Sequence, residues 1–399
     1  MTRQVVVVGS GFAGLTAALE LSRKLTASEM VTVISASPYF VFLPSLIWVA
    51  QGWREIEDIS FTIPPVLAEA GVKFIHARLE QINPRARVLT LSDGQLIYYD
   101  KLLLATGGEW VWDSVPGLRP KPQGHIVSIF SPGDALKARL YWQDFLVNPG
   151  PVVIGVMPWA SLYGAVYEFA LNLAAILHKK YSRDKVDITF VTPEPFLGHF
   201  GHDGLGNSRQ MLESAFSQQG IRWLTKTEVT RVEADRVILG DQQYLPSQFT
   251  VLAPPNRGIK PIRDVPGLAD DEGHVPVDPY YRSLRDLSIF AVGGAMQVKP
   301  KVQTLFPCGV FVPGVVSAEM GRIAAANIAA DLWHGQPVQK RREAINAFYV
   351  LDSGAQGLFI TLGPQSWLNF QINIPGPWSH WAKVIAEKHQ MWQLQTGNF

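Results

Sequence analysis

Residues 4–15 read QVVVVGSGFAGL, and this stretch decides the fold. Four consecutive valines predict a buried parallel strand. The strand leads into a turn with the pattern Gly9-x-Gly11-x-x-Gly14, and residues 15–22 have helical spacing. In such a unit the first glycine permits a tight turn, the second admits a pyrophosphate and the third allows close helix packing. The segment therefore predicts a dinucleotide site, with the phosphates at the start of the helix.

The composition of the chain excludes several classes of protein. Its 399 residues, 47% of them hydrophobic, are enough for two or three domains with sizeable cores. A formal net charge of +1 gives no electrostatic case for a nucleic-acid partner. The single cysteine, Cys308, excludes an internal disulfide and a cysteine-rich metal site, so no metal is expected. It also favours a reducing, cytoplasmic compartment, and no signal peptide precedes the first strand.

Residues 150–167 carry no charge and are long enough to imitate a membrane span. Pro151 and Pro158 interrupt this run, and residues 151–155 repeat the strand-then-glycine pattern of the N-terminus. We therefore expect a second buried βα unit here. The predicted fold class is α/β, with two Rossmann-like dinucleotide-binding domains, the second inserted into the first, and a C-terminal module.

The expected domain boundaries follow from the points at which the pattern of strand, glycine turn and helix begins again. The first dinucleotide-binding domain is predicted to consist of residues 1–110 and 256–335. The second Rossmann-like domain is predicted at 111–255, and residues 336–399 form the C-terminal module.

The C-terminal module contains a predicted amphipathic helix. From Trp378 onward, the apolar positions 381, 382, 385 and 392 share one helical face, and Lys383, Glu387 and Lys388 lie largely off it. Tryptophan with flanking lysines is typical of a helix that lies in a membrane surface. A dimer contact or packing between domains is the alternative, and the sequence leaves both open.

Three segments of the chain resemble the FAD-contacting segments of two-domain flavoprotein disulfide reductases. They are the 9–14 turn, Ala105-Thr106-Gly107 at the end of a strand, and residues 289–293. Within that superfamily the chain resembles the sulfide:quinone oxidoreductases, on the segments 38–54, 160–169, 189–195 and 383–392. The resemblance covers nearly the whole chain.

This resemblance implies FAD as the cofactor, a quinone as the electron acceptor and a small-molecule donor, with a sulfur species among the candidates. It implies a cytoplasmic protein, peripheral on the inner face of the cell membrane, and a homo-oligomer remains open. Ser35 takes the place near the ribose that an acidic residue usually holds. The FAD-contacting residues are predicted to be Gly9, Ser10, Gly11, Phe12, Ala13, Gly14, Ser35, Ala36, Pro44, Ala105, Thr106, Gly107, Gly293 and Gly294.

The chain departs from the family at its redox centre. The two central cysteine positions of the family correspond to Leu162 and Ala295 here, and the accessory one corresponds to Phe130. The family's lysine near the flavin pyrimidine becomes Val312. A relay of two cysteines therefore cannot operate. Cys308 remains as a candidate catalytic thiol that adds to the flavin or binds one sulfur atom; the alternative is a small buried hydrophobe.

Glu168 is the second candidate catalytic residue. A carboxylate in apolar surroundings can have a raised pKa and relay the protons that quinone reduction needs. A structural ion pair is the alternative. Together these features predict an FAD-dependent oxidoreductase of the sulfide:quinone type that passes electrons from a small donor to a quinone without a disulfide relay.

Two other functions stay open at this point. The first is a type II NADH:quinone oxidoreductase, which needs a second intact glycine turn. Residues 155–160 keep only Gly155, and the side chains of Met157 and Trp159 would crowd the phosphate. The second is a flavin-binding sensor or assembly protein without turnover.

Overall fold

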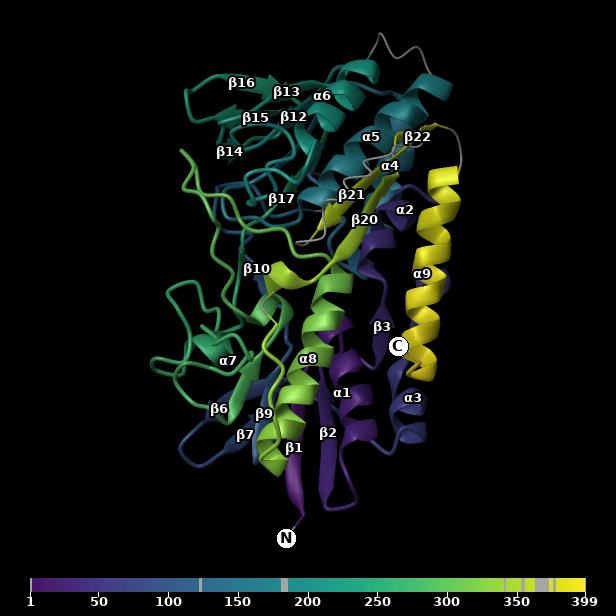
Figure 1. Ribbon diagram of the computed structural model, residues 1–399. Coiled ribbons are helices and arrows are strands. Elements are labelled where there is room, and N and C mark those ends of the chain that lie inside the picture. The colour runs from purple at the N-terminus through teal and green to yellow at the C-terminus, as the bar shows by residue number, and fades with distance from the viewer. Residues whose placement is uncertain are drawn as a thin grey trace.

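The structure is a computed structural model that describes residues 2–121, 124–180, 186–340, 342–352, 356–362, 373–375 and 378–398. It contains two α/β units, each built on a parallel sheet, and a C-terminal segment that contacts both units (Figure 1). The α/β class that the sequence predicts is confirmed.

The first sheet has the strand order β19-β9-β1-β2-β5, and all its strands are parallel. The valines of β1 lie in its centre, where Val5, Val6 and Val7 are fully buried. A central strand of a parallel sheet is covered on both faces, which explains the unbroken apolar run. The strands are β1 (Arg3–Val8), β2 (Glu29–Ser35), β5 (Lys73–His76), β9 (Lys101–Leu104) and β19 (Ile289–Ala291).

Two helices, α1 (Phe12–Lys24) and α8 (Gly314–Trp333), lie side by side against this sheet (Figure 1). They approach closely because a Cβ on Gly321 would lie only 2.2 Å from the carbonyl oxygen of Ala13. The remaining elements of this unit are β3 (Tyr39–Val41), β4 (Ser60–Thr62), β6 (Leu79–Asn83), β7 (Val88–Leu91), β8 (Leu96–Tyr98), α2 (Leu46–Ala50), α3 (Ile63–Glu69), α7 (Lys260–Arg263), and the 3₁₀ helices η1 (Leu43–Ser45), η2 (Glu57–Ile59) and η4 (Gly293–Ala295).

The second sheet has the order β13-β12-β11-β17 and is also parallel. The uncharged run at 150–167 forms β11 and the start of α5, as predicted, and no helix among the described residues is long and apolar enough to cross a bilayer. The elements of this unit are α4 (Pro132–Val147), β11 (Val152–Val156), α5 (Tyr163–Lys180), β12 (Ile188–Val191), α6 (Ser208–Gln218), β13 (Arg222–Leu224), β14 (Val229–Val232), β15 (Arg236–Leu239), β16 (Tyr244–Pro246) and β17 (Phe249–Ala253).

The chain leaves the first sheet after β9 and returns to it at β19, so the second unit is inserted into the first. The outgoing strand β10 (Glu109–Trp110) and the returning strand β18 (Asn256–Arg257) pair antiparallel. The Glu109 carboxylate accepts hydrogen bonds from Arg257, at 2.8 Å, and from Arg263, at 2.6 Å. The two connections are therefore tied to each other.

The C-terminal segment forms a small antiparallel sheet and a long helix. In α9, the apolar face that the sequence predicts points outward: Trp381, Ile385 and Trp392 are 58%, 66% and 48% exposed. Lys383 and Glu387 point into the protein and are buried. The elements are η5 (Arg342–Ala344), β20 (Ala347–Asp352), β21 (Gln356–Leu362), β22 (Asn373–Pro375) and α9 (Trp378–Thr396).

Candidate active site

The turn after β1 forms one wall of a cradle. Gly9 has a φ of +102°, and a Cβ on it would lie 2.3 Å from the carbonyl oxygen of Ala105, so only glycine fits. A Cβ on Gly14 would lie 1.9 Å from the Gly9 carbonyl oxygen. A Cβ on Gly11 would have no other atom within 4 Å, so the backbone is accessible there. The first turn of α1 has neither a side-chain cap nor an acidic residue. The free N–H groups at this helix start fit a phosphate group.

Ser35, at the end of β2, lies beside this turn. The Ser10 hydroxyl donates a 2.7 Å hydrogen bond to the Ser35 hydroxyl, and the backbone N–H of Ser37 donates to the same oxygen at 3.3 Å. Since a hydroxyl has one donor and two acceptor positions, Ser35 keeps its own hydrogen for another partner. This arrangement fits a ribose hydroxyl at the expected place.

Two further glycine turns complete the cradle. Gly107 follows β9 and Gly293 follows β19, with φ angles of +67° and +60°. A Cβ on Gly294 would lie 3.3 Å from the Gly107 Cα, and one on Gly293 would lie 3.6 Å from the Ala13 Cβ. The ends of β1, β9 and β19 therefore meet, as the sequence predicts, and the three turns together fit a flavin dinucleotide.

An ion pair between Glu168 and Lys383 contacts Pro44, which lies two residues after Phe42, whose ring is 5.5 Å from the Phe12 ring of the first turn. Glu168, on α5, is fully buried and pairs with Lys383 of α9. The Lys383 ammonium also donates to the Pro44 carbonyl oxygen at 3.2 Å and lies 4.4 Å from the centre of the Trp48 ring. Burial raises the pKa of Glu168 to about 7, although the Lys383 charge acts in the opposite direction. Glu168 can therefore gain or lose a proton near neutral pH.

Glu387 makes a second connection from α9 to the same segment. The Ser45 hydroxyl donates to the fully buried Glu387 carboxylate at 2.5 Å. Two consecutive residues of η1, Pro44 and Ser45, are thus held by two side chains of α9 one helical turn apart. Sequence reasoning missed this contact. The signal that could have found it is the pair of charges at i and i+4, on the helix face opposite the tryptophans.

Residues 307–311, which include Cys308, are hydrogen-bonded to two loops of the second unit. The Trp159 N–H donates to the Pro307 carbonyl oxygen at 2.9 Å, and the Phe311 N–H donates to the Phe200 carbonyl oxygen at 3.1 Å. The Cys308 side chain is buried, and burial raises the pKa of its thiol. At neutral pH the group is therefore a thiol and not the thiolate that acts as a nucleophile.

The same residues, 307–311, pack against the second glycine turn at 155–160. Gly155 lies within β11, where a Cβ would be 2.2 Å from the Val191 carbonyl oxygen, so its role is strand packing. Met157 is buried, and Trp159 has a φ of +64° with its N–H already bonded to Pro307. This turn has no free backbone donor at Trp159 for a pyrophosphate, which opposes a nicotinamide site here.

Comparison with known proteins places this architecture in a family. The pyridine nucleotide-disulphide oxidoreductase family matches residues 3–305. A sulfide-quinone reductase of Aquifex aeolicus is 33% identical over 100% of this chain and 92% of its own. The crystal structure of the sulfide:quinone oxidoreductase from that bacterium matches with a TM-score of 0.91, over 99% of this chain and 92% of that one. The chain belongs to the sulfide:quinone oxidoreductase family. It is a flavin-dependent oxidoreductase.

Other relatives are more distant. An NADH dehydrogenase-like protein of Mycobacterium tuberculosis is 29% identical over 91% of this chain and 88% of its own. The structure of NDH2 from Plasmodium falciparum, 14% identical with a TM-score of 0.70 over 99% of this chain and 96% of that one, shares the fold.

This sulfide:quinone oxidoreductase family member has apolar side chains at the cysteine positions that the resemblance implies. Ala295 is fully buried, Phe130 is 7% exposed, and Leu162 packs against the main core. The Phe130 ring lies 5.9 Å from the Trp110 ring, measured between centroids. None of these three side chains contains sulfur, so they cannot form a disulfide relay. Among the described residues, no group of three or more His, Cys, Asp or Glu side chains is arranged to hold a metal ion.

Proposed function

We propose that this family member binds FAD in the cradle of the three glycine turns and transfers electrons from a small donor to a quinone. The observation that carries the proposal is the buried Glu168–Lys383 pair, which joins α5, α9 and the carbonyl of Pro44, a residue predicted to contact FAD. Bound there, FAD would supply two-electron chemistry between donor and acceptor.

Reduction of a quinone to a quinol needs two protons as well as two electrons, and we assign one proton to Glu168. With a pKa of about 7, this carboxyl group holds a proton that it can release at neutral pH. Lys383 stabilises the carboxylate that remains, and its ammonium is held in place by Pro44 and Trp48. Glu168 therefore acts as the proton donor, and the positive charge of Lys383 stabilises the carboxylate that it leaves.

The donor is proposed to react at the flavin itself. A two-cysteine relay is absent, and the route through Cys308 would need a thiolate that burial disfavours. A sulfur species remains the first donor to test, because the relative with 33% identity is a sulfide-quinone reductase. NADH is the less favoured donor because the second turn is filled.

The outer face of α9 supports a peripheral membrane location, next to the lipid in which a quinone is dissolved, and we assign it to the cytoplasmic side of the membrane. Trp381, Ile385 and Trp392 are exposed on this face, and exposed tryptophans on one side of a helix suit a membrane surface. Trp53, 40% exposed, lies with its ring 6.3 Å from the His380 ring and extends the same surface. A dimer contact is the alternative for this face.

One anaerobic experiment tests the proposal. The purified protein is mixed in turn with sulfide, polysulfide, a thiol and NADH, and bleaching of the visible flavin band is followed; a short-chain quinone is then added. We expect bleaching by a sulfur donor, little by NADH, and recovery of the band with quinone. Protein without a flavin band, or flavin that no donor bleaches and no quinone restores, would refute the proposal and favour a role without turnover.

A further inference from the structure

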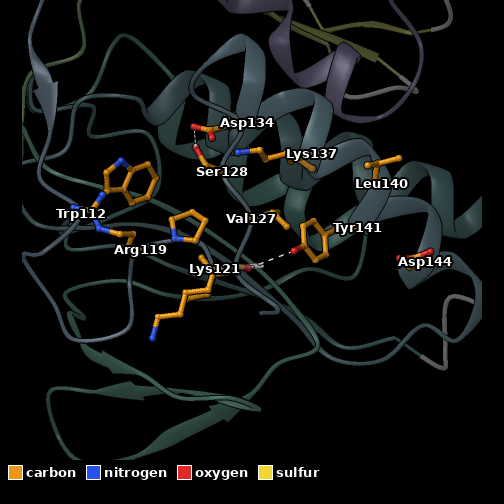
Figure 2. Close-up of a pocket in the computed structure, with 13 residues that line it drawn as sticks. Trp112, Arg119, Lys121, Val127, Ser128, Asp134, Lys137, Leu140, Tyr141 and Asp144 are labelled. Carbon is orange, nitrogen blue, oxygen red and sulfur yellow. Dashed lines mark hydrogen bonds between the residues drawn. The ribbon is translucent and has the colours of Figure 1, made fainter. Parts of the chain in front are cut away.

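A cavity outside the candidate active site lies in the second unit, between α4 and the segment that follows β10 (Figure 2). Its volume is about 680 Å³. Small-molecule sites have volumes of roughly 300–1,000 Å³. None of its lining residues belongs to the glycine cradle or to the α9 contacts. The proposed electron transfer leaves this cavity without a role.

The cavity has an apolar floor and two aromatic rings. Val127 and Ser128 form part of the floor and are buried, beside Ile126, which forms a bridge to Thr250 of β17. Trp112 lies at one end and Tyr141 on the α4 side, as Figure 2 shows. An apolar floor with aromatic rings at its sides suits a flat, apolar ligand.

The charges around the cavity are unevenly distributed. Lys121 and Lys137 line it, and neither has an ion-pair partner among the residues that the structure describes. Arg119 pairs with Asp113 at 2.7 Å, but this pair is solvent-exposed and can rearrange readily. Three cationic side chains thus line the cavity, and Figure 2 shows the Lys121 side chain pointing away from Lys137.

Two carboxylates also line the cavity. The Asp134 carboxylate accepts a 2.9 Å hydrogen bond from the Ser128 hydroxyl, so part of its acceptor capacity is used within the protein. Asp144 lies about two helical turns beyond Lys137 on α4, at the other end of the cavity. Asp134 lies one helical turn before Lys137, but no ion pair joins these two described residues, so the Lys137 ammonium can accept an anionic group at a distance from Asp144.

We propose that this cavity binds a small organic anion with a planar ring, of the aromatic carboxylate class. The carboxylate contacts the Lys137 ammonium, and the ring lies on the floor between Trp112 and Tyr141. Binding at this place joins α4 to the segment that connects the two units. It needs neither FAD nor a quinone, so the inference stands apart from the proposed redox function.

The test uses the full-length protein, as purified, and isothermal titration with 2-naphthoate and its neutral analogue 2-naphthalenemethanol. We expect Lys137→Met to weaken naphthoate binding tenfold or more, because a charge-assisted hydrogen bond is lost, and to leave binding of the alcohol unchanged. Trp112→Ala should weaken both ligands several-fold. Lys73→Met, an exposed lysine of the other unit, is the matched control and should change neither.

Three results would overturn the proposal. The first is naphthoate binding that is equal in wild type and Lys137→Met. The second is the absence of binding at millimolar ligand. The third is loss of binding in Trp381→Ala, which would place the ligand on the exposed face of α9. Thermal unfolding of each variant separates lost binding from lost folding: it should match wild type at the exposed positions Lys73, Lys137 and Trp381, and should occur at a lower temperature in Trp112→Ala, because that ring packs against both hydrophobic cores.

Discussion

Ser45 and Glu387 lie 342 positions apart, and the Ser45 hydroxyl donates a 2.5 Å hydrogen bond to the buried Glu387 carboxylate. The acceptor is on the C-terminal helix and the donor is on the segment predicted to face the flavin. The position of α9 and the geometry of the candidate site are therefore coupled directly.

Glu387→Ala removes the acceptor and leaves a buried Ser45 hydroxyl without its partner. We expect the free energy of unfolding to fall by about 1–3 kcal/mol, measured by urea denaturation, and the visible flavin spectrum to shift. Glu213→Ala, on the second unit, is the control and should leave the spectrum as in wild type. An unaltered flavin spectrum in Glu387→Ala would show that η1 keeps its position without α9.

Glu168→Gln removes the proposed proton donor and keeps the shape of the side chain. We expect quinone reduction to slow by about 10²–10⁴-fold, with donor-dependent flavin bleaching unchanged. In wild type the quinone step should decline as pH rises above about 7, because the carboxyl group then loses its proton; the variant should lack this decline. Stopped-flow measurement of both half-reactions decides, and a quinone step that is equally fast in the variant contradicts the assignment.

The raised pKa of Glu168 also predicts how stability depends on pH. The folded state holds this proton up to about pH 7, whereas the unfolded chain releases it near the usual glutamate pKa of 4.5. The folded state therefore binds more protons in this window, and the contribution of Glu168 to stability falls as pH rises through it. Glu168→Gln should unfold with a weaker dependence on pH between these values. Parallel denaturation curves at pH 5 and 7.5 measure the difference.

Lys383→Met removes the cation that keeps the pKa of Glu168 from rising further. The decline of the quinone step should therefore move to higher pH. A buried carboxylate without its partner should lower the free energy of unfolding by about 3–5 kcal/mol at high pH, and by less at pH 6, where Glu168 is protonated. Lys73→Met, an exposed lysine on β5 of the first unit, should show neither effect.

Cys308→Ala should retain turnover with the sulfur donor within about twofold, because a buried thiol with a raised pKa is a poor nucleophile. Loss of a small buried side chain should lower stability by about 1 kcal/mol. Steady-state rates with sulfide and quinone provide the measurement. A rate reduced tenfold or more, in a variant that still binds flavin, would assign the thiol a direct role.

The sequence predicted the parts of the structure that depend on local rules. The valine run and the glycines at 9–14 had to form a buried strand and a close turn, and they do. The inner face of α9 was not predictable in this way. Lys383 and Glu387 resemble solvent-facing residues, and they are buried because their partners, Glu168 and Ser45, lie more than two hundred positions away in the chain. Gly155 had the expected residue type but serves strand packing instead of a phosphate.

The pairing of β19 with β9 has a consequence for how this chain folds. Leu102 of β9 is in register with Ile289 of β19. One edge of β9 therefore stays unpaired until almost three-quarters of the chain has left the ribosome. The inserted unit has its complete parallel sheet between residues 152 and 253 and can form it earlier. Contacts between residues so far apart in the chain form slowly. The inserted unit can therefore fold first during synthesis, and the nucleotide cradle is assembled after it.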